Sequence, residues 1–186
     1  MIAWTAIALP TLLAAVLVFI ASSLIHMVIQ WHKPDYRGLS NEDEVRAALR
    51  KGSASPGQYI VPHCKSPKEM AEPAMVKKLE EGPVATLYVR PNGVTKLGSF
   101  LGMWFAYTIV VGLLVGTLAR SVLPHDAPYM HVFHLVAGAA WLAYAWQGPQ
   151  ESIWKGVPWI STLRYMIDGL VYALLTAGAF AWLWPR

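Results

Sequence analysis

The chain has 186 residues, of which 55% are hydrophobic and only 14% are charged, a composition too apolar for an ordinary water-soluble domain. Its formal net charge is +4, but the basic residues are concentrated in a few segments, and we expect no nucleic-acid partner. Because Cys64 is the one cysteine, an intramolecular disulfide, a zinc ribbon and a CxxC redox pair are excluded.

The first predicted element is a membrane-spanning helix. Residues 1–25 contain no Asp, Glu, Lys, Arg or His, and a helix of that length rises about 37 Å, more than the roughly 30 Å of a hydrocarbon core. A cleaved signal peptide would need a basic start and a small-residue cleavage site, which this segment lacks. We therefore expect residues 1–30 to form an uncleaved transmembrane helix.

Residues 31–96 are polar and have helix and strand signals of their own. Two helices are expected, each with a capping residue at its start and a glycine at its end: residues 40–52 and 66–82. Ser66 caps the second helix, Pro67 occupies its first position, and Pro73 should kink or divide it. Two β-type runs flank that helix: residues 58–61 and 84–89. This pattern predicts a small α+β insert.

Three further apolar runs follow the insert, each about long enough to cross a membrane: residues 97–119, 129–147 and 163–184. We expect Gly148 and Pro149 to stop the middle run. The predicted fold is an all-α membrane protein with four transmembrane helices and a small α+β cytoplasmic insert between helices 1 and 2. Residues 97–186 then hold transmembrane helices 2–4, with a cytoplasmic loop at 148–163.

The distribution of Lys and Arg predicts the orientation of the chain. Residues 31–96 hold eleven of these residues and residues 148–164 hold two, whereas the opposite side holds only Arg120 and Arg186. Basic residues resist translocation, so we expect the insert and the 148–163 loop to be cytoplasmic and both termini to be periplasmic. The predicted location is the bacterial inner (plasma) membrane, with several passes through the bilayer.

Four ionisable side chains are expected at membrane depth, where burial of charge is costly and often marks function: His26, His131, His134 and Asp168. His26 and Asp168 fall in the cytoplasmic halves of their helices. With Glu151 they form a candidate polar membrane site, such as a proton relay. In the alternative, structural interpretation, Arg164 forms an i,i+4 ion pair with Asp168 and satisfies this carboxylate locally.

His131 and His134 lie on one helix face near the predicted outer surface, next to Met130. Imidazole and thioether groups suit copper and related metals. The stretch from His134 to Trp141 resembles a helix in some haem- or copper-associated bacterial membrane proteins. An ordinary interfacial role is favoured over a metal site, because the spacing lacks a second ligand pair and neutral imidazole is tolerated at helix ends.

Gly112 and Gly116 have the small-xxx-small spacing that lets helix backbones approach closely. Small residues also recur on the last predicted helix, at Ala173, Ala177 and Gly178. These two patterns favour packing against another helix, either in a homo-oligomer or in a larger membrane complex. The sequence contains no GxGxxG, Walker, HExxH or GxSxG motif, so we expect a non-catalytic role.

Three stretches carry a resemblance that covers most of the chain: residues 22–27, 31–33 and 166–178. They resemble a family of bacterial four-helix inner-membrane proteins of unknown function, and the resemblance implies a fold but no activity. The leading hypothesis is an assembly or accessory component in the lipid bilayer. The alternatives are a small oligomeric transporter or channel with a His–Asp site, and a haem- or copper-binding membrane protein.

Overall fold

The structure is a computed structural model that describes residues 2–185, and these form two units. The helical unit combines the N-terminal segment through Tyr36 with the chain from Lys96 onward, and the insert unit is Arg37–Thr95. The chain is mostly helical, with one two-stranded sheet. The insert was expected to begin at Trp31, but residues 31–36 belong to the helical unit because they fold back onto it.

The first helix ends in a reversal of the chain. α1 (Trp4–Ser23) continues directly into a π-helical turn, η1 (Leu24–Ile29); such turns are rare and often occur at functional sites. At Gln30 the backbone takes a left-handed φ of 54°, and its N–H bonds to the carbonyl of Ile25 at 2.9 Å. This C-cap turns the chain back, and the short 3₁₀ helix η2 (Lys33–Asp35) follows.

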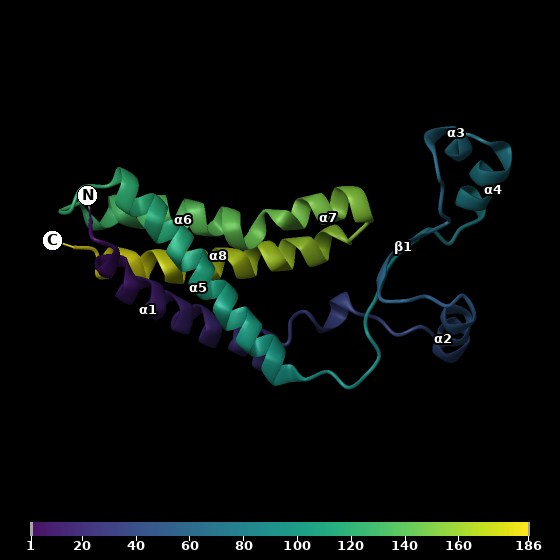
Figure 1. Cartoon of the computed structure of the whole chain (residues 1–186), viewed down its shortest axis with the longest axis horizontal. Helices are drawn as coiled ribbons and strands as arrows, with labels where there is room; N and C mark the ends of the chain where they lie inside the picture. Colours follow the sequence, from purple (N-terminus) through teal and green to yellow (C-terminus); the bar gives the residue numbers. More distant parts are fainter. Residues whose placement is uncertain (1, 186) are drawn as a thin grey trace. The chain divides into compact units, whose positions relative to one another are not determined.

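Four more helices complete the helical unit: α5 (Leu97–Val122), α6 (Tyr129–Ala145), α7 (Gln147–Lys155) and α8 (Trp159–Trp182). α8 packs along both α6 and α1, and α5 packs against α1 and α6 (Figure 1). The core between these helices consists mainly of small and β-branched side chains, together with Phe180, which is fully buried. Such side chains let the helix axes approach closely.

Three helices are long and apolar enough to cross a membrane: Trp4–Ile29, Leu97–Val122 and Trp159–Trp182. Large apolar side chains on their outer faces are more than half exposed, among them Leu9, Leu12, Ile20 and Leu114. Extended exposed apolar surface is unusual on a soluble monomer and is what contact with lipid requires. By length and composition, three of the four predicted transmembrane helices are therefore able to cross a membrane.

The remaining predicted span is shorter than expected. α6 ends at Ala145 and α7 begins at Gln147, so Gly148 and Pro149 lie in the first turn of α7 and do not stop the preceding helix. Proline is tolerated there because the first N–H groups of a helix have no intrahelical acceptor. With 17 residues, α6 rises only about 25 Å.

The insert unit contains the predicted helices and strands: α2 (Glu42–Lys51), β1 (Gly57–Val61), α3 (Pro67–Met70), α4 (Pro73–Glu81) and β2 (Ala85–Val89). β1 and β2 pair antiparallel. The Ser66 hydroxyl accepts a hydrogen bond from the Glu69 N–H at 3.2 Å, which confirms the predicted cap. Pro73 divides the second predicted helix into α3 and α4, because its ring cannot continue a helix without losing a backbone hydrogen bond.

Gly112 and Gly116 are contact points within this chain. A Cβ atom at Gly112 would lie 3.0 Å from Cγ2 of Thr11 on α1, and one at Gly116 would lie 2.8 Å from Cε1 of Phe180 on α8. Ala173 on α8 is also fully buried in the helical unit. The close approach predicted from the small residues thus joins α5 to α1 and α8 of the same chain.

Candidate functional site

Imidazole and carboxylate groups come together where η1, η2 and the first half of α8 meet. We call His26, His32 and Asp168 the His–Asp cluster. One potential ligand atom from each of the three lies within 4.8 Å of those from the other two. Asp35 and Arg164 adjoin the cluster. The reversal at Gln30 is what carries His32 back toward α8, 136 positions away along the chain.

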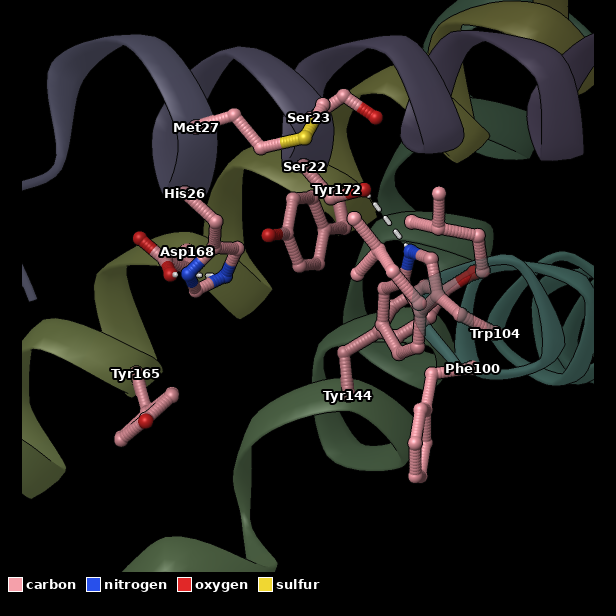
Figure 2. A pocket seen from close by; sticks show the side chains of 12 residues that line it. Ser22, Ser23, His26, Met27, Phe100, Trp104, Tyr144, Tyr165, Asp168 and Tyr172 are labelled. Carbon is pink, nitrogen blue, oxygen red and sulfur yellow. Dashed lines mark hydrogen bonds and ion pairs between the residues drawn. The ribbon is translucent and has the colours of Figure 1, made fainter. Parts of the chain in front are cut away.

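Asp168 is the centre of the cluster and is 2% exposed. Its Oδ2 lies 2.7 Å from Nε2 of His32 and 3.5 Å from Nε2 of His26, and Figure 2 shows His26 beside this carboxylate. The other oxygen, Oδ1, accepts a hydrogen bond from the Trp31 indole N–H at 3.2 Å. These partners offset the large cost of burying a carboxylate.

The two ring nitrogens of His32 face two different carboxylates. Nδ1 lies 2.8 Å from Oδ2 of Asp35, and Nε2 lies 2.7 Å from Oδ2 of Asp168. A neutral imidazole has one N–H and donates to only one of them. Its second nitrogen then directs a lone pair at a carboxylate oxygen, which is repulsive. The geometry therefore requires either an additional proton at the contact between Nε2 and Asp168 or another cation beside Nε2.

Asp35 fixes the orientation of His32. The side chain of Asp35 is 3% exposed, and it accepts hydrogen bonds from the Ser161 hydroxyl at 2.8 Å and from the Arg164 guanidinium. Burial by itself would raise the pKa of the Asp35 carboxyl, but the hydrogen bonds from His32, Ser161 and Arg164 outweigh it and hold this pKa below its ordinary value. Asp35 is thus ionised at neutral pH and favours a proton on Nδ1 of His32.

Aromatic rings hold the His32 imidazole in place. It is stacked against His26, with ring centroids 4.8 Å apart, and against Tyr165 on α8, with centroids 4.4 Å apart. The Tyr165 hydroxyl in turn bonds to the Tyr36 hydroxyl at 3.2 Å. Groups that bind a ligand or ion need such support from neighbouring side chains, because their affinity depends on their orientation.

A pocket of about 420 Å³ opens beside the cluster, within the range of small-molecule sites (Figure 2). His26 and Asp168 line its polar end. The rest of the lining is largely apolar and aromatic, and it includes Leu97, Phe100 and Trp104 from α5. The pocket therefore joins a polar end to an apolar body.

Tyr172 supplies a buried polar group without a hydrogen-bond partner among the described residues. The residue is 4% exposed and lines the pocket, and its hydroxyl is unpaired. In Figure 2 this hydroxyl points toward the side of the pocket where His26 and Asp168 lie. An unsatisfied buried donor costs about 1–3 kcal/mol. The Trp104 indole N–H, by contrast, donates to the Ser22 hydroxyl at 2.8 Å.

The structure brings two of the three predicted polar-site residues together. His26 and Asp168 are neighbours, whereas Glu151 lies on α7 and accepts hydrogen bonds from Lys155 at 2.7 Å and Gln147 at 3.2 Å. The predicted ion pair between Arg164 and Asp168 is wrong, because the Arg164 guanidinium binds Asp35. The reversal at Gln30 brings the Asp35 carboxylate to Arg164. The i,i+4 spacing of Arg164 and Asp168 gives no information about a carboxylate that comes from another segment of the chain.

His131 and His134 are exposed on α6. Among residues 2–185, neither belongs to a group of three or more side chains that could hold a metal ion. His32 is not among the site residues predicted from the sequence, because only ionisable side chains expected at membrane depth were considered. One signal could have identified it: an indole, an imidazole and a carboxylate occur within five residues, directly after a helix without charges.

No protein-family model matches this chain, and neither the curated proteins nor the solved structures gave a significant match.

Proposed function

We propose that the helical unit crosses the bacterial inner membrane four times, with both termini in the periplasm and the Arg37–Thr95 unit in the cytoplasm. Two hydrogen bonds support a shared end for the termini. Arg120 Nε donates to the carbonyl of Ile2 at 2.9 Å, and the Trp184 indole donates to the carbonyl of Pro124 at 3.0 Å. Both chain ends thus adjoin the α5–α6 connection, on the side with few basic residues.

The fourth crossing is carried by α6 together with α7. α6 starts at the end of the unit that holds both termini, and α7 adjoins the start of α8, where the hydroxyls of Ser152 and Thr162 are 2.6 Å apart. A chain that crosses with α1, α5 and α8 must return between α5 and α8. This connectivity supports a crossing that the length of α6 by itself does not.

The single cysteine provides the test of orientation. A membrane-impermeant maleimide should label Cys64 in inverted vesicles and should not label it in intact spheroplasts. In a Cys64→Ser background, an Asp126→Cys variant should give the opposite pattern, because residue 126 is exposed in the α5–α6 connection. Labelling of Cys64 in intact spheroplasts, with the control behaving as stated, would contradict the orientation.

We further propose that the protein binds one divalent transition-metal ion at the His–Asp cluster. The observation that carries this proposal is that both ring nitrogens of His32 face a carboxylate. Nδ1 is directed at the ionised carboxylate of Asp35, and Nε2 lies 2.7 Å from the carboxylate of Asp168. A cation bound by His26, His32 and Asp168 would remove the repulsion. Asp35 would then orient a ligating histidine through its other ring nitrogen, an arrangement common in metal sites.

The donor set indicates which metals fit. Ligands about 2.1 Å from an ion lie about 3–4 Å from one another, and the His26–Asp168 distance is 3.5 Å. The shorter His32–Asp168 distance of 2.7 Å would widen slightly around an ion. Two imidazoles and one carboxylate suit Fe²⁺, Zn²⁺ and related ions. Three protein ligands leave coordination positions open toward the pocket, as in catalytic metal sites.

Metal analysis of the full chain, purified in mild detergent from its native membrane, tests this proposal. We expect about one transition-metal ion per chain. An Asp35→Asn variant should bind the metal roughly 10–100-fold more weakly, because an amide no longer holds the Nδ1 proton of His32 as a carboxylate does. A metal-free wild-type protein that also fails to bind added Zn²⁺ or Fe²⁺ would overturn the metal site and leave a shared proton as the explanation of the contact between His32 and Asp168.

A further inference from the structure

We infer that the pocket binds a free fatty acid, with the carboxylate at the His–Asp cluster and the acyl chain along the α5 side of the lining. The inference deepens the proposed function, because the charge of the polar end rests on the metal ion. Its second, independent support is the unpaired Tyr172 hydroxyl, which depends on no metal.

The charge of the polar end favours an anionic head group. A divalent ion and Arg164, which is paired with Asp35, together carry three positive charges, whereas Asp35 and Asp168 carry two negative ones, so one net positive charge remains at the cluster. An added carboxylate compensates this charge and can occupy an open coordination position. The Tyr172 hydroxyl points toward the same end of the pocket (Figure 2) and supplies a donor for the second carboxylate oxygen.

The remainder of the pocket favours an acyl chain. Met27, Leu97 and Phe100 line it and are themselves exposed. These residues belong to the segments Trp4–Ile29 and Leu97–Val122, which are apolar enough to cross a membrane, so the exposed rim faces lipid in the proposed arrangement. A membrane-soluble molecule thus reaches the cluster from the bilayer without entering water.

The size of the pocket favours a molecule with one chain. A volume of about 420 Å³ lies near the lower end of the roughly 300–1,000 Å³ usual for small-molecule sites. A phospholipid has two acyl chains and a larger head group, whereas a fatty acid has one chain and a compact carboxylate. The structure therefore assigns the site to the smaller of these two membrane constituents.

Photocrosslinking of the full chain in lipid nanodiscs tests the inference. A diazirine-bearing palmitic acid should crosslink to residues of the pocket, and unlabelled palmitate should compete while hexadecanol, which has the same chain and a neutral head, should compete poorly. In a Tyr172→Phe variant, half-competition should require at least about tenfold more palmitate, since a hydrogen bond to a charged group is lost. Tyr107→Phe is the matched control, because the Tyr107 hydroxyl donates to the carbonyl of Ala143 instead.

The Tyr172→Phe variant separates binding from folding. It removes a hydroxyl that has no partner among the described residues, so its thermal midpoint and its metal content should match or exceed those of the wild type. A metal-free protein that still binds palmitate through Tyr172 would overturn the metal site and support the fatty-acid site. Equal competition by palmitate and hexadecanol, or unchanged competition in the variant, would overturn the fatty-acid site alone.

Discussion

Replacing Asp168 with Asn should abolish stoichiometric metal binding and leave the fold intact. The amide keeps an oxygen that can accept the Trp31 indole hydrogen bond, now 3.2 Å long, so the local packing is retained. It removes the negative charge that lies between His26 and His32. Losing a ligand should weaken metal binding by more than the roughly 10–100-fold typical of an outer-shell group.

Isothermal titration of the purified variant with Zn²⁺ and Fe²⁺ measures this loss. The matched control is a His131→Ala, His134→Ala double variant, because these two histidines are exposed on α6 and lie outside the cluster. The control should retain the metal at wild-type affinity. Loss of the metal in the control, with retention in Asp168→Asn, would transfer the site to α6 and restore the copper hypothesis that the sequence suggested.

The second large effect is expected at the contact between α5 and α8. Substitution of Gly116 by Leu should lower the thermal unfolding midpoint strongly, since even a Cβ atom at this position would lie 2.8 Å from Phe180 and 3.3 Å from Ile7. Both neighbours are buried, so neither can make room by turning into solvent. Overpacking of this kind costs about 1–3 kcal/mol and occasionally more.

Gly178 on α8 provides the comparison. A Cβ at Gly178 would meet nothing within 4 Å, so Gly178→Leu should leave the unfolding midpoint in detergent unchanged or raise it, because leucine has the higher helix propensity. Equal midpoints for the Gly116 and Gly178 variants would show that α5 does not approach α8 closely. Chemical crosslinking of the wild type in native membranes would then be the next measurement, since the small residues would be available to another copy.

The sequence by itself determined the elements that depend on neighbouring residues. Runs without charges marked the apolar helices, because burying a charge in lipid is costly. In the insert, Ser66 and Pro67 marked a helix start and Pro73 marked a break, because capping and proline sterics act within one helical turn. The close approach at Gly116 was also predictable as a property of the spacing.

Only the tertiary structure decided which residues meet. The left-handed turn at Gln30 brings His32 to Asp168, which is 136 positions away, and gives Arg164 a partner in Asp35. The glycines of α5 contact helices of their own chain, and α6 ends before Gly148. Each outcome depends on contacts between distant segments, whose energies arise only when the helices pack, so local spacing and composition do not contain them.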